Sequence, residues 1–219
     1  MADVILIGGH GKVALLAAPL LVEAGHTVTS VIRNPDHVDE VRATGAEPLV
    51  LDVEQADETE LAAAFDGKDA VVWSAGAGGG NPARTTAVDR DAAIRSMDAA
   101  RTAGVDRYVM VSYLGASLDH GVPEDDDFHA YAQAKAEADE HLRGSGLDWT
   151  ILGPGALTLE EPTGRIAANP SREQVSDSSA TSRGNVARTI VAALASGESI
   201  GRQVEYVDGD TPIEDVFPA

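Results

Sequence analysis

A short apolar run that meets a glycine-rich turn is the feature that most constrains this chain. Residues 4–7 read VILI, residues 8–11 read GGHG, and an alanine- and leucine-rich segment follows at 13–24. A short, unbroken, branched run is typical of a parallel strand buried on both faces, and Gly25 predicts the end of a helix. Because the N–H groups and dipole at a helix N-terminus favour an anion, the sequence predicts a phosphate-binding turn.

Strand-like and helix-like segments alternate along the rest of the chain. Further strands are expected at 26–32, 47–52, 69–74, 106–112 and 147–152, and helices at 36–44, 57–65, 84–103, 128–143 and 186–196. The region 165–175 favours one or two short strands, and 202–207 predicts a last strand near the sheet edge. This spacing predicts an α/β fold of the Rossmann type: a doubly wound, mostly parallel sheet with helices on both faces and a ligand at the carboxyl ends of the strands.

The length of the chain and its loops predict how it is organised. The 219 residues contain no linker and no internal repeat, so we expect one domain over residues 1–219 with a core large enough to fold alone. The longer loops follow the fourth, fifth and sixth expected strands. We therefore expect a small C-terminal region on the substrate side, with the substrate bordered mainly by residues 114–128 and 155–185.

The composition excludes several classes of function. The chain has no cysteine, which excludes disulfides, zinc–thiolate sites, iron–sulfur clusters and a cysteine nucleophile, and we expect no metal site. The first residues lack a basic leader, and no apolar run approaches the length of a membrane span. We therefore expect a cytoplasmic protein.

The charge of the chain limits its partners. With 36 acidic and 16 basic residues, the net charge is −20, which argues against a nucleic acid or an anionic membrane as partner. The acidic surface suits either a cationic partner or high salt, which screens the self-repulsion. Only Lys12, Lys68 and Lys135 are lysines. Low lysine with high aspartate resembles the proteins of extreme halophiles, and we favour that interpretation.

Polar side chains at the ends of the second and third expected strands indicate which nucleotide the turn would hold. A protein that binds NAD usually places Asp or Glu after the second strand, for the ribose 2′-hydroxyl; here Arg33 stands there. A guanidinium suits a 2′-phosphate, and Lys12 adds a second positive charge, although Arg33 in a solvated loop is the alternative. Asp52 either accepts a hydrogen bond from an adenine amino group or caps the next turn. His10 is expected in the loop, facing phosphate or solvent.

A tyrosine and a lysine one helical turn apart indicate a reaction site. Tyr131 and Lys135 share one face of an expected helix, and a nearby ammonium favours the phenolate, so that the tyrosine can act as an acid or base. Ser112 ends the fifth expected strand. The alternative is a surface helix in which Lys135 pairs with Glu137 or Asp139.

Several short motifs together resemble a known family. They are Gly8-Gly-His-Gly-Lys-Val-Ala14, Val31-Ile-Arg-Asn-Pro35, Trp73-Ser-Ala-Gly-Ala-Gly-Gly79, Val88-Asp-Arg-Asp-Ala-Ala-Ile94, Gly104-Val-Asp-Arg-Tyr-Val-Met-Val-Ser112, Tyr131-Ala-Gln-Ala-Lys135, Leu152-Gly-Pro-Gly155 and Gly209-Asp-Thr-Pro212. The chain resembles the atypical short-chain dehydrogenase/reductase group, NAD(P)H-binding proteins related to NmrA and to flavin and biliverdin reductases. The resemblance covers nearly the whole chain, and it is specific for the fold and the nucleotide but not for the substrate.

The resemblance implies a site for NADP(H), preferred over NAD(H). The residues that it assigns to the cofactor are Gly8, Gly9, His10, Gly11, Lys12, Val13, Arg33, Asp52, Val53, Ser74, Ala75, Gly76, Pro154 and Gly155. Among them, Arg33 would take the 2′-phosphate, and Pro154 with Gly155 would close over the nicotinamide. It places Ser112, Tyr131 and Lys135 beside the nicotinamide as the catalytic residues.

Three positions depart from the pattern of that family. Tyr113 follows Ser112 where a second serine is often found, Gly153 stands in place of an arginine, and Asn185 stands in place of an aspartate. The first departure weakens a complete Ser–Tyr–Lys set, and the first two together favour a non-catalytic sensor. The third is mild, because both residue types cap helices.

Two classes of function fit these observations. The first is an NADPH-dependent reductase of a small carbonyl, quinone or flavin-like substrate, with nucleotide-sugar epimerisation or dehydration as a related reaction. The second is a non-catalytic redox sensor of the NmrA type that binds a protein partner. The sequence does not identify the substrate, and it leaves both a monomer and a homodimer open.

Overall fold

A computed structural model describes residues 1–78, 81–171 and 179–218, and confirms the expected α/β fold. Its largest sheet has the strand order β11-β8-β10-β6-β5-β4-β1-β2-β3. These strands are β1 (Asp3–Ile7), β2 (Thr27–Ile32), β3 (Glu47–Val50), β4 (Ala70–Trp73), β5 (Arg107–Val111), β6 (Asp148–Pro154), β8 (Arg165–Ala168), β10 (Arg202–Asp208) and β11 (Thr211–Pro212). From β3 to β10 all neighbours are parallel, and β8 and β11 continue the sheet in antiparallel pairs.

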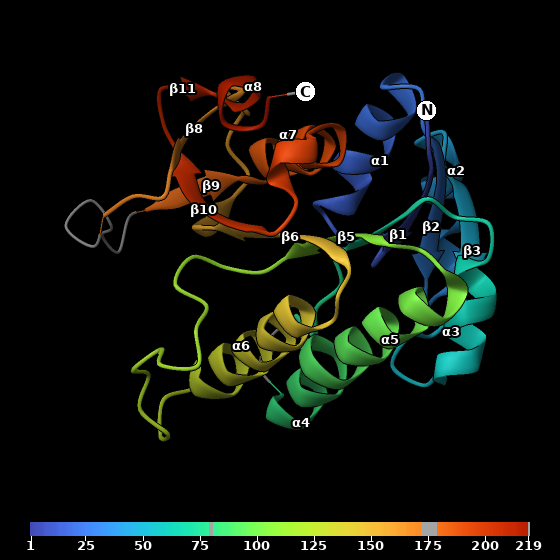
Figure 1. The fold of residues 1–219 in the computed structure, drawn as a ribbon, viewed down its shortest axis with the longest axis horizontal. Coiled ribbons are helices and arrows are strands. Elements are labelled where there is room, and N and C mark those ends of the chain that lie inside the picture. Colours follow the sequence, from blue (N-terminus) through green and yellow to red (C-terminus); the bar gives the residue numbers. More distant parts are fainter. Residues whose placement is uncertain (79–80, 172–178, 219) are drawn as a thin grey trace.

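Helices cover both faces of the sheet (Figure 1). One face packs against α1 (Ala14–Glu23), α2 (Val38–Ala43), α7 (Arg183–Ala195) and α8 (Ile213–Val216). The other face packs against α3 (Glu58–Phe65), α5 (Ala93–Ala103) and α6 (His129–Gly144). The described residues also include two single-turn 3-10 helices, η1 (Pro35–His37) and η3 (Gly197–Ser199).

The central strand β1 shows why the sequence of residues 4–7 is apolar throughout. Val4 and Leu6 face the cluster beneath α1, whereas Ile5 and Ile7 face the cluster beneath α5, and all four side chains are fully buried. Successive side chains of a strand point to opposite faces, so a strand covered on both sides needs apolar residues at every position.

The strand order places a switch point at the centre of the sheet. From β1 the chain runs outward through β2 and β3, and then returns to β4 on the other side of β1. In doubly wound sheets the ligand binds outside the carboxyl ends of the strands at such a point. The segments that follow β1 and β4 are therefore the first place to look for a site.

The structure differs from the expected elements in several places. The helix expected at 84–103 is divided into α4 (Pro82–Thr85), a π-helical segment η2 (Thr86–Ala92) and α5. A separate two-stranded sheet joins β7 (Ala156–Thr158) to β9 (Ala180–Ser182), neither of which we expected. The expectation that the last long strand lies near the sheet edge is wrong in detail, because β8 folds back and pairs with β10 on its outer side.

Some expectations concern residues that the structure does not describe. Gly79, Gly80 and residues 172–178 lie outside the described residues, so the second glycine-rich stretch and the strand expected at 165–175 are seen only in part. Within the described part of the chain, no helix is long and apolar enough to cross a membrane.

Candidate functional site

The glycine turn after β1 is packed too closely to admit side chains. Gly8 has a φ of +82°, and a Cβ there would lie 2.7 Å from the Cα of Ala75, while a Cβ on Gly9 would lie 2.6 Å from the Cβ of Ser30. The N–H of Gly11 donates to the carbonyl of Gly8 at 2.7 Å and closes the turn. The turn is thus held tightly between β2 and the segment that follows β4, which fixes its backbone for a ligand.

Helix α1 begins directly after this turn with no side chain capping its N-terminus. Its N-cap residue, Val13, offers no side-chain acceptor, and the first turn holds no acidic residue. The first N–H groups of a helix have no intrahelical partner, and the helix dipole adds a partial positive charge there. The residues present therefore fit the diphosphate of a dinucleotide.

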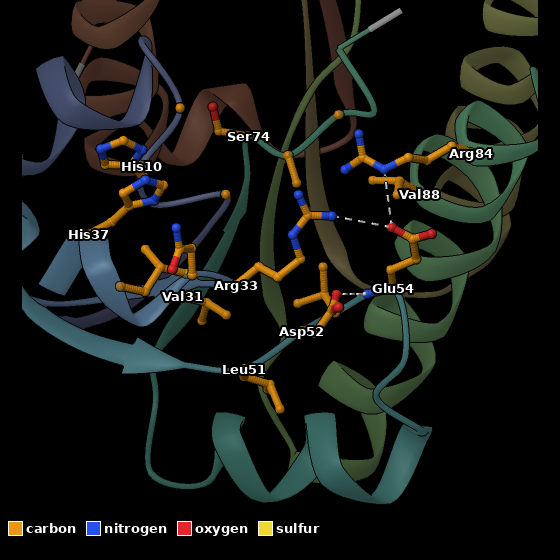
Figure 2. Close-up of a pocket in the computed structure, with 17 residues that line it drawn as sticks. His10, Val31, Arg33, His37, Leu51, Asp52, Glu54, Ser74, Arg84 and Val88 are labelled. Atoms are coloured by element: carbon orange, nitrogen blue, oxygen red, sulfur yellow. Dashed lines mark hydrogen bonds and ion pairs between the residues drawn. The ribbon is translucent and has the colours of Figure 1, made fainter. Parts of the chain in front are cut away.

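A cavity of about 290 Å³ lies beside the turn, at the ends of β1, β2 and β4 (Figure 2). Two arginines in its wall point toward one carboxylate. Arg33 Nη1 lies 3.7 Å from Glu54 Oε2, and Arg84 Nε lies 3.3 Å from the same oxygen. Arg84 also donates to the carbonyl of Ala77 at 2.7 Å, which fixes its position. The small cavity therefore presents two guanidinium groups to a ligand, with Glu54 as their common partner.

Other polar groups of the small cavity already have partners. Asp52 Oδ1 accepts a hydrogen bond from the N–H of Glu54 at 3.1 Å, so it caps the turn, which is one of the two roles expected for it. His10 Nε2 lies 2.7 Å from Glu40 Oε2, and its ring stacks on His37 with centroids 3.5 Å apart. Both imidazoles border the cavity, together with Val53 and Gly11.

A second cavity of about 960 Å³ adjoins the first. The two cavities share the wall formed by Ser74, Ala75 and Gly76, which follow β4. The larger one is also lined by Val13, by Ser112 after β5, and by Tyr131 and Lys135 of α6. A ligand that fills both cavities crosses the switch point next to the glycine turn, as the fold predicts for a dinucleotide.

Lys135 is buried and directed at the end of β5. It is 1% exposed, and its Nζ donates to the carbonyl of Val111 at 2.8 Å. The alternative of a surface helix is therefore wrong for Lys135, although Asp139, one of the two partners expected in that alternative, does interact with the lysine. Two buried carboxylates, Asp89 and Asp139, interact electrostatically with its ammonium, which compensates part of the cost of burying these charges.

Asp89 and Asp139 are held in different ways. Asp89, on the π-helical segment η2, accepts a hydrogen bond from the N–H of Ala77 at 3.0 Å. Burial raises its pKa, and Lys135 acts in the opposite direction. Asp139, one turn after Lys135 on α6, accepts a short hydrogen bond of 2.5 Å from Ser112 Oγ. Burial raises the pKa of Asp139 to about 6 against the lowering effect of Lys135.

Tyr131 has the opposite pKa shift from the one that its spacing to Lys135 predicts. Burial raises the pKa of the Tyr131 phenol above its usual range, and the acidic groups of Asp89 and Asp139, with Tyr113, raise it further. The lowering expected from Lys135 is wrong, because burial, the largest cause, and the two carboxylates all disfavour the phenolate. The Tyr131 phenol is therefore protonated at neutral pH, so its hydroxyl has a proton to donate.

The mouth of the larger cavity is acidic and partly aromatic. Residues 124–127, which read EDDD, line it, and the exposed side chains of Phe128 and Leu157 lie beside them. The rings of Tyr113, Phe128 and Tyr131 lie 5.3–5.4 Å apart. The entrance thus combines apolar surface with negative charge.

Four expected cofactor residues line neither cavity. Lys12 is exposed, and Gly9 faces Ser30 of β2 instead of open space. Pro154 ends β6, and the N–H of Gly155 donates to Tyr206 of β10 at 2.9 Å. These positions shape the backbone around the site; the other expected cofactor residues border one cavity or both.

The site brings together three side chains that had no expected role, Glu54, Arg84 and Asp89. It also includes Asp139, which was expected only as a partner of Lys135 on a surface helix. Asp139 carried a signal, because it lies four residues after Lys135 and so shares the helix face of Tyr131 and Lys135. Asp89 lay in a quoted motif, but its approach to Ala77 depends on the π-helical segment. Nothing in the sequence pairs Glu54 with Arg84.

Comparison with known proteins identifies the class. The family described as NAD(P)H-binding matches residues 8–197, so this chain belongs to that family of NAD(P)H-binding proteins. The match spans the glycine turn, both cavities and α6.

Individual relatives are similar over almost the whole chain. The uncharacterized sugar epimerase YhfK of Bacillus subtilis is 34% identical, over 98% of this chain and 98% of that protein. A solved structure described as an NAD-dependent epimerase/dehydratase from Bacillus halodurans is 32% identical, with a TM-score of 0.90 over 99% of both chains. The oxidoreductase ylbE from Lactococcus lactis is 29% identical, with a TM-score of 0.85 over 98% of this chain and 94% of that one.

Proposed function

We propose that this chain is an NADPH-dependent reductase of a small carbonyl compound, of the atypical short-chain dehydrogenase/reductase type. The observation that carries the proposal is the pair of cavities that share the segment 74–76. The small cavity offers two arginines. The larger cavity offers three polar side chains of the kinds that bind and protonate a carbonyl oxygen: Ser112, Tyr131 and Lys135.

The small cavity supports NADP(H) over NAD(H). Arg33 stands where the ribose 2′ position lies in dinucleotide folds, and its ion pair with Glu54 at 3.7 Å is too long for a hydrogen bond. Because little is lost when that contact opens, Arg33 is available for a 2′-phosphate. Arg84 then remains as the ion-pair partner of Glu54.

The larger cavity supports chemistry at a carbonyl. When bound, the nicotinamide would supply a hydride, which is the chemistry that the protein itself lacks. Tyr131 donates a hydrogen bond to the substrate oxygen, and Lys135 holds the end of β5 through the Val111 carbonyl and keeps Asp89 and Asp139 compensated. Ser112 borders the same space. Of the segments 114–128 and 155–185 expected on the substrate side, residues 124–128 and Leu157 line this cavity.

The charge at the entrance favours a neutral or cationic substrate. The acidic residues 124–127 lie on the path into the larger cavity, and like charges repel an incoming phosphate or carboxylate. A simple ketone, aldehyde or quinone meets this condition, and so does a flavin-like ring without phosphate.

A sugar nucleotide epimerase is the second candidate, since one relative is named a sugar epimerase and another an epimerase/dehydratase. The entrance is unfavourable for a sugar diphosphate, which would place two more negative charges beside residues 124–127. A non-catalytic sensor would use the same cofactor site without turnover.

The test is NADPH oxidation with a panel of aldehydes, ketones, quinones and dephosphorylated flavins, followed by the absorbance of NADPH. Consumption of NADPH that depends on one acceptor class supports the reductase. Conversion of a sugar nucleotide without net NADPH consumption supports the epimerase. Tight NADPH binding with neither reaction indicates the sensor, and no binding of either nucleotide contradicts all three.

A further inference from the structure

The single proton of the Ser112 hydroxyl can be donated either to Asp139 or to a group in the larger cavity, but not to both. Ser112 borders the larger cavity, and its Oγ donates to Asp139 Oδ2 at 2.5 Å. A serine hydroxyl has one proton and two lone pairs, and an ionised carboxylate only accepts. While Asp139 is ionised, Ser112 Oγ therefore presents only its lone pairs to the cavity and cannot donate a hydrogen bond to a carbonyl oxygen.

Protonation of Asp139 reverses this arrangement. A protonated carboxyl donates one hydrogen bond, and the partner in reach of Asp139 Oδ2 is Ser112 Oγ. Once Asp139 donates to that oxygen, the serine proton is released and can point into the cavity. The protonation state of a buried side chain thus decides whether Ser112 is an acceptor or a donor.

The surroundings of Asp139 make both states accessible. Asp139 is fully buried, and its Oδ1 has no hydrogen-bond partner among the described residues. The charged and titratable groups that face it come from α6, from β10 and from the loop after β5; they are Lys135, Arg143, Tyr131, Glu205 and Tyr113. Burial raises the pKa of Asp139 to about 6, Glu205 acts in the same direction, and Lys135, the bond from Ser112 and Arg143 oppose it.

We propose that Asp139 is a positioning residue that sets the direction of the Ser112 hydroxyl and, when protonated, supplies through it the proton for the oxygen of a carbonyl substrate. This inference rests on the proposed reductase function. The carbonyl carbon gains the hydride from NADPH, and its oxygen gains the proton of Ser112. Ser112 takes the proton of Asp139, and the products are an alcohol, NADP⁺ and an ionised Asp139. Water that enters after the product leaves returns the proton.

The first test follows the carboxyl group directly, without nucleotide. Infrared spectra of the protein are recorded against pH for wild type, Asp139→Asn, Ser112→Ala and the control Glu140→Gln. Glu140 precedes the last turn of the same helix and is exposed, with Arg143 as its partner. In wild type and in Glu140→Gln we expect a carboxyl band that titrates near neutrality. The band should be missing in Asp139→Asn. In Ser112→Ala its titration should move to higher pH, because a stabilising hydrogen bond to the carboxylate is lost.

The second test is the pH dependence of kcat/KM for carbonyl reduction. We expect wild type and Glu140→Gln to lose about tenfold per pH unit above the pKa of Asp139, as for a single required proton, and Asp139→Asn to be slow with no such inflection. An inflection that survives in Asp139→Asn overturns the proposal.

The two tests separate this inference from the proposed function. If wild type binds NADPH but reduces no acceptor, the proposed function fails. A carboxyl band that is lost in Asp139→Asn and shifted in Ser112→Ala would still support the link between Asp139 and Ser112. If NADPH is consumed but no carboxyl titrates in this way, the reductase stands and the role of Asp139 is overturned.

Discussion

The cluster of Arg33, Glu54 and Arg84 predicts opposite effects of two substitutions on nucleotide affinity. Arg33→Ala removes the guanidinium that would bind the 2′-phosphate. A hydrogen bond to a charged group contributes roughly 1.5–3 kcal/mol. Because the Arg33 side chain is 56% exposed, we expect a loss of about 2 kcal/mol, which is roughly 30-fold in the affinity for NADP. The affinity for NAD, which lacks that phosphate, should change less than about threefold.

Glu54→Gln should change the affinity for NADP in the other direction. Its carboxylate lies 3.7 Å from Arg33 and is 21% exposed, so it competes with an incoming phosphate. In fully solvated surroundings two unit charges about 4 Å apart interact by about 1 kcal/mol, and on that basis we expect roughly fivefold tighter NADP binding with NAD little changed.

Isothermal titration at one ionic strength measures both effects. The control is Arg42→Ala, which removes an equally exposed arginine that pairs with Asp39 and lines neither cavity. Equal losses of NADP and NAD affinity in Arg33→Ala, or a loss as large in Arg42→Ala, would refute the assignment of Arg33.

Four further predictions follow from the site and the surface. Gly8→Ala should lose both nucleotides in titration, because a Cβ there lies 2.7 Å from backbone at a φ of +82°. Lys135→Met should lower the free energy of unfolding, measured with urea, by about 3–5 kcal/mol. The loss should be smaller in acid, because Asp89 and Asp139 without their cation bind protons more strongly in the folded protein. Tyr131→Phe should lower kcat less than about 20-fold, as for a lost hydrogen bond, with NADPH affinity kept. Far-UV circular dichroism should fall in salt-free buffer, because the net charge is −20.

Particular outcomes would contradict each of these four. Nucleotide binding by Gly8→Ala would remove the turn from the site. A stability loss in Lys135→Met that grows in acid would show that the lysine does not compensate carboxylates. A loss of kcat in Tyr131→Phe by about 100-fold or more would indicate proton transfer by the phenol, and an unchanged spectrum without salt would count against adaptation to high salt.

The sheet and most of its helices were predictable because they depend on local pattern. The apolar residues 4–7 and Gly8 define β1 and its turn, and Gly104, with a φ of +73°, ends α5 as its position suggested. The π-helical segment 86–92 was not predictable, since no residue pattern in the sequence marks it, and so the hydrogen bond from the N–H of Ala77 to Asp89 was not expected either. The place of β10 inside the sheet depends on β8 folding back, which the sequence around 165–175 did not indicate.

The residues that border the cavities were predictable where their place at a strand end puts them there. Properties that depend on burial, such as the pKa of a side chain, were not. The end of β2 places Arg33 in the small cavity, and the end of β4 places Ser74 between the two cavities. The pKa of Tyr131 was predicted with the wrong sign, because helix spacing shows Lys135 but neither the burial of the phenol nor the carboxylate of Asp89, which comes from a distant segment. Electrostatics in a buried site depends on such non-local neighbours.

A crystal structure with NADP tests the central claim most directly. The account predicts the diphosphate at the N-terminus of α1, the 2′-phosphate within hydrogen-bond distance of Arg33, and the nicotinamide in the larger cavity beside Ser112 and Lys135. A nucleotide bound with its adenine end away from Arg33, or with its nicotinamide outside the larger cavity, would contradict the claim that the two cavities form one NADP(H) site.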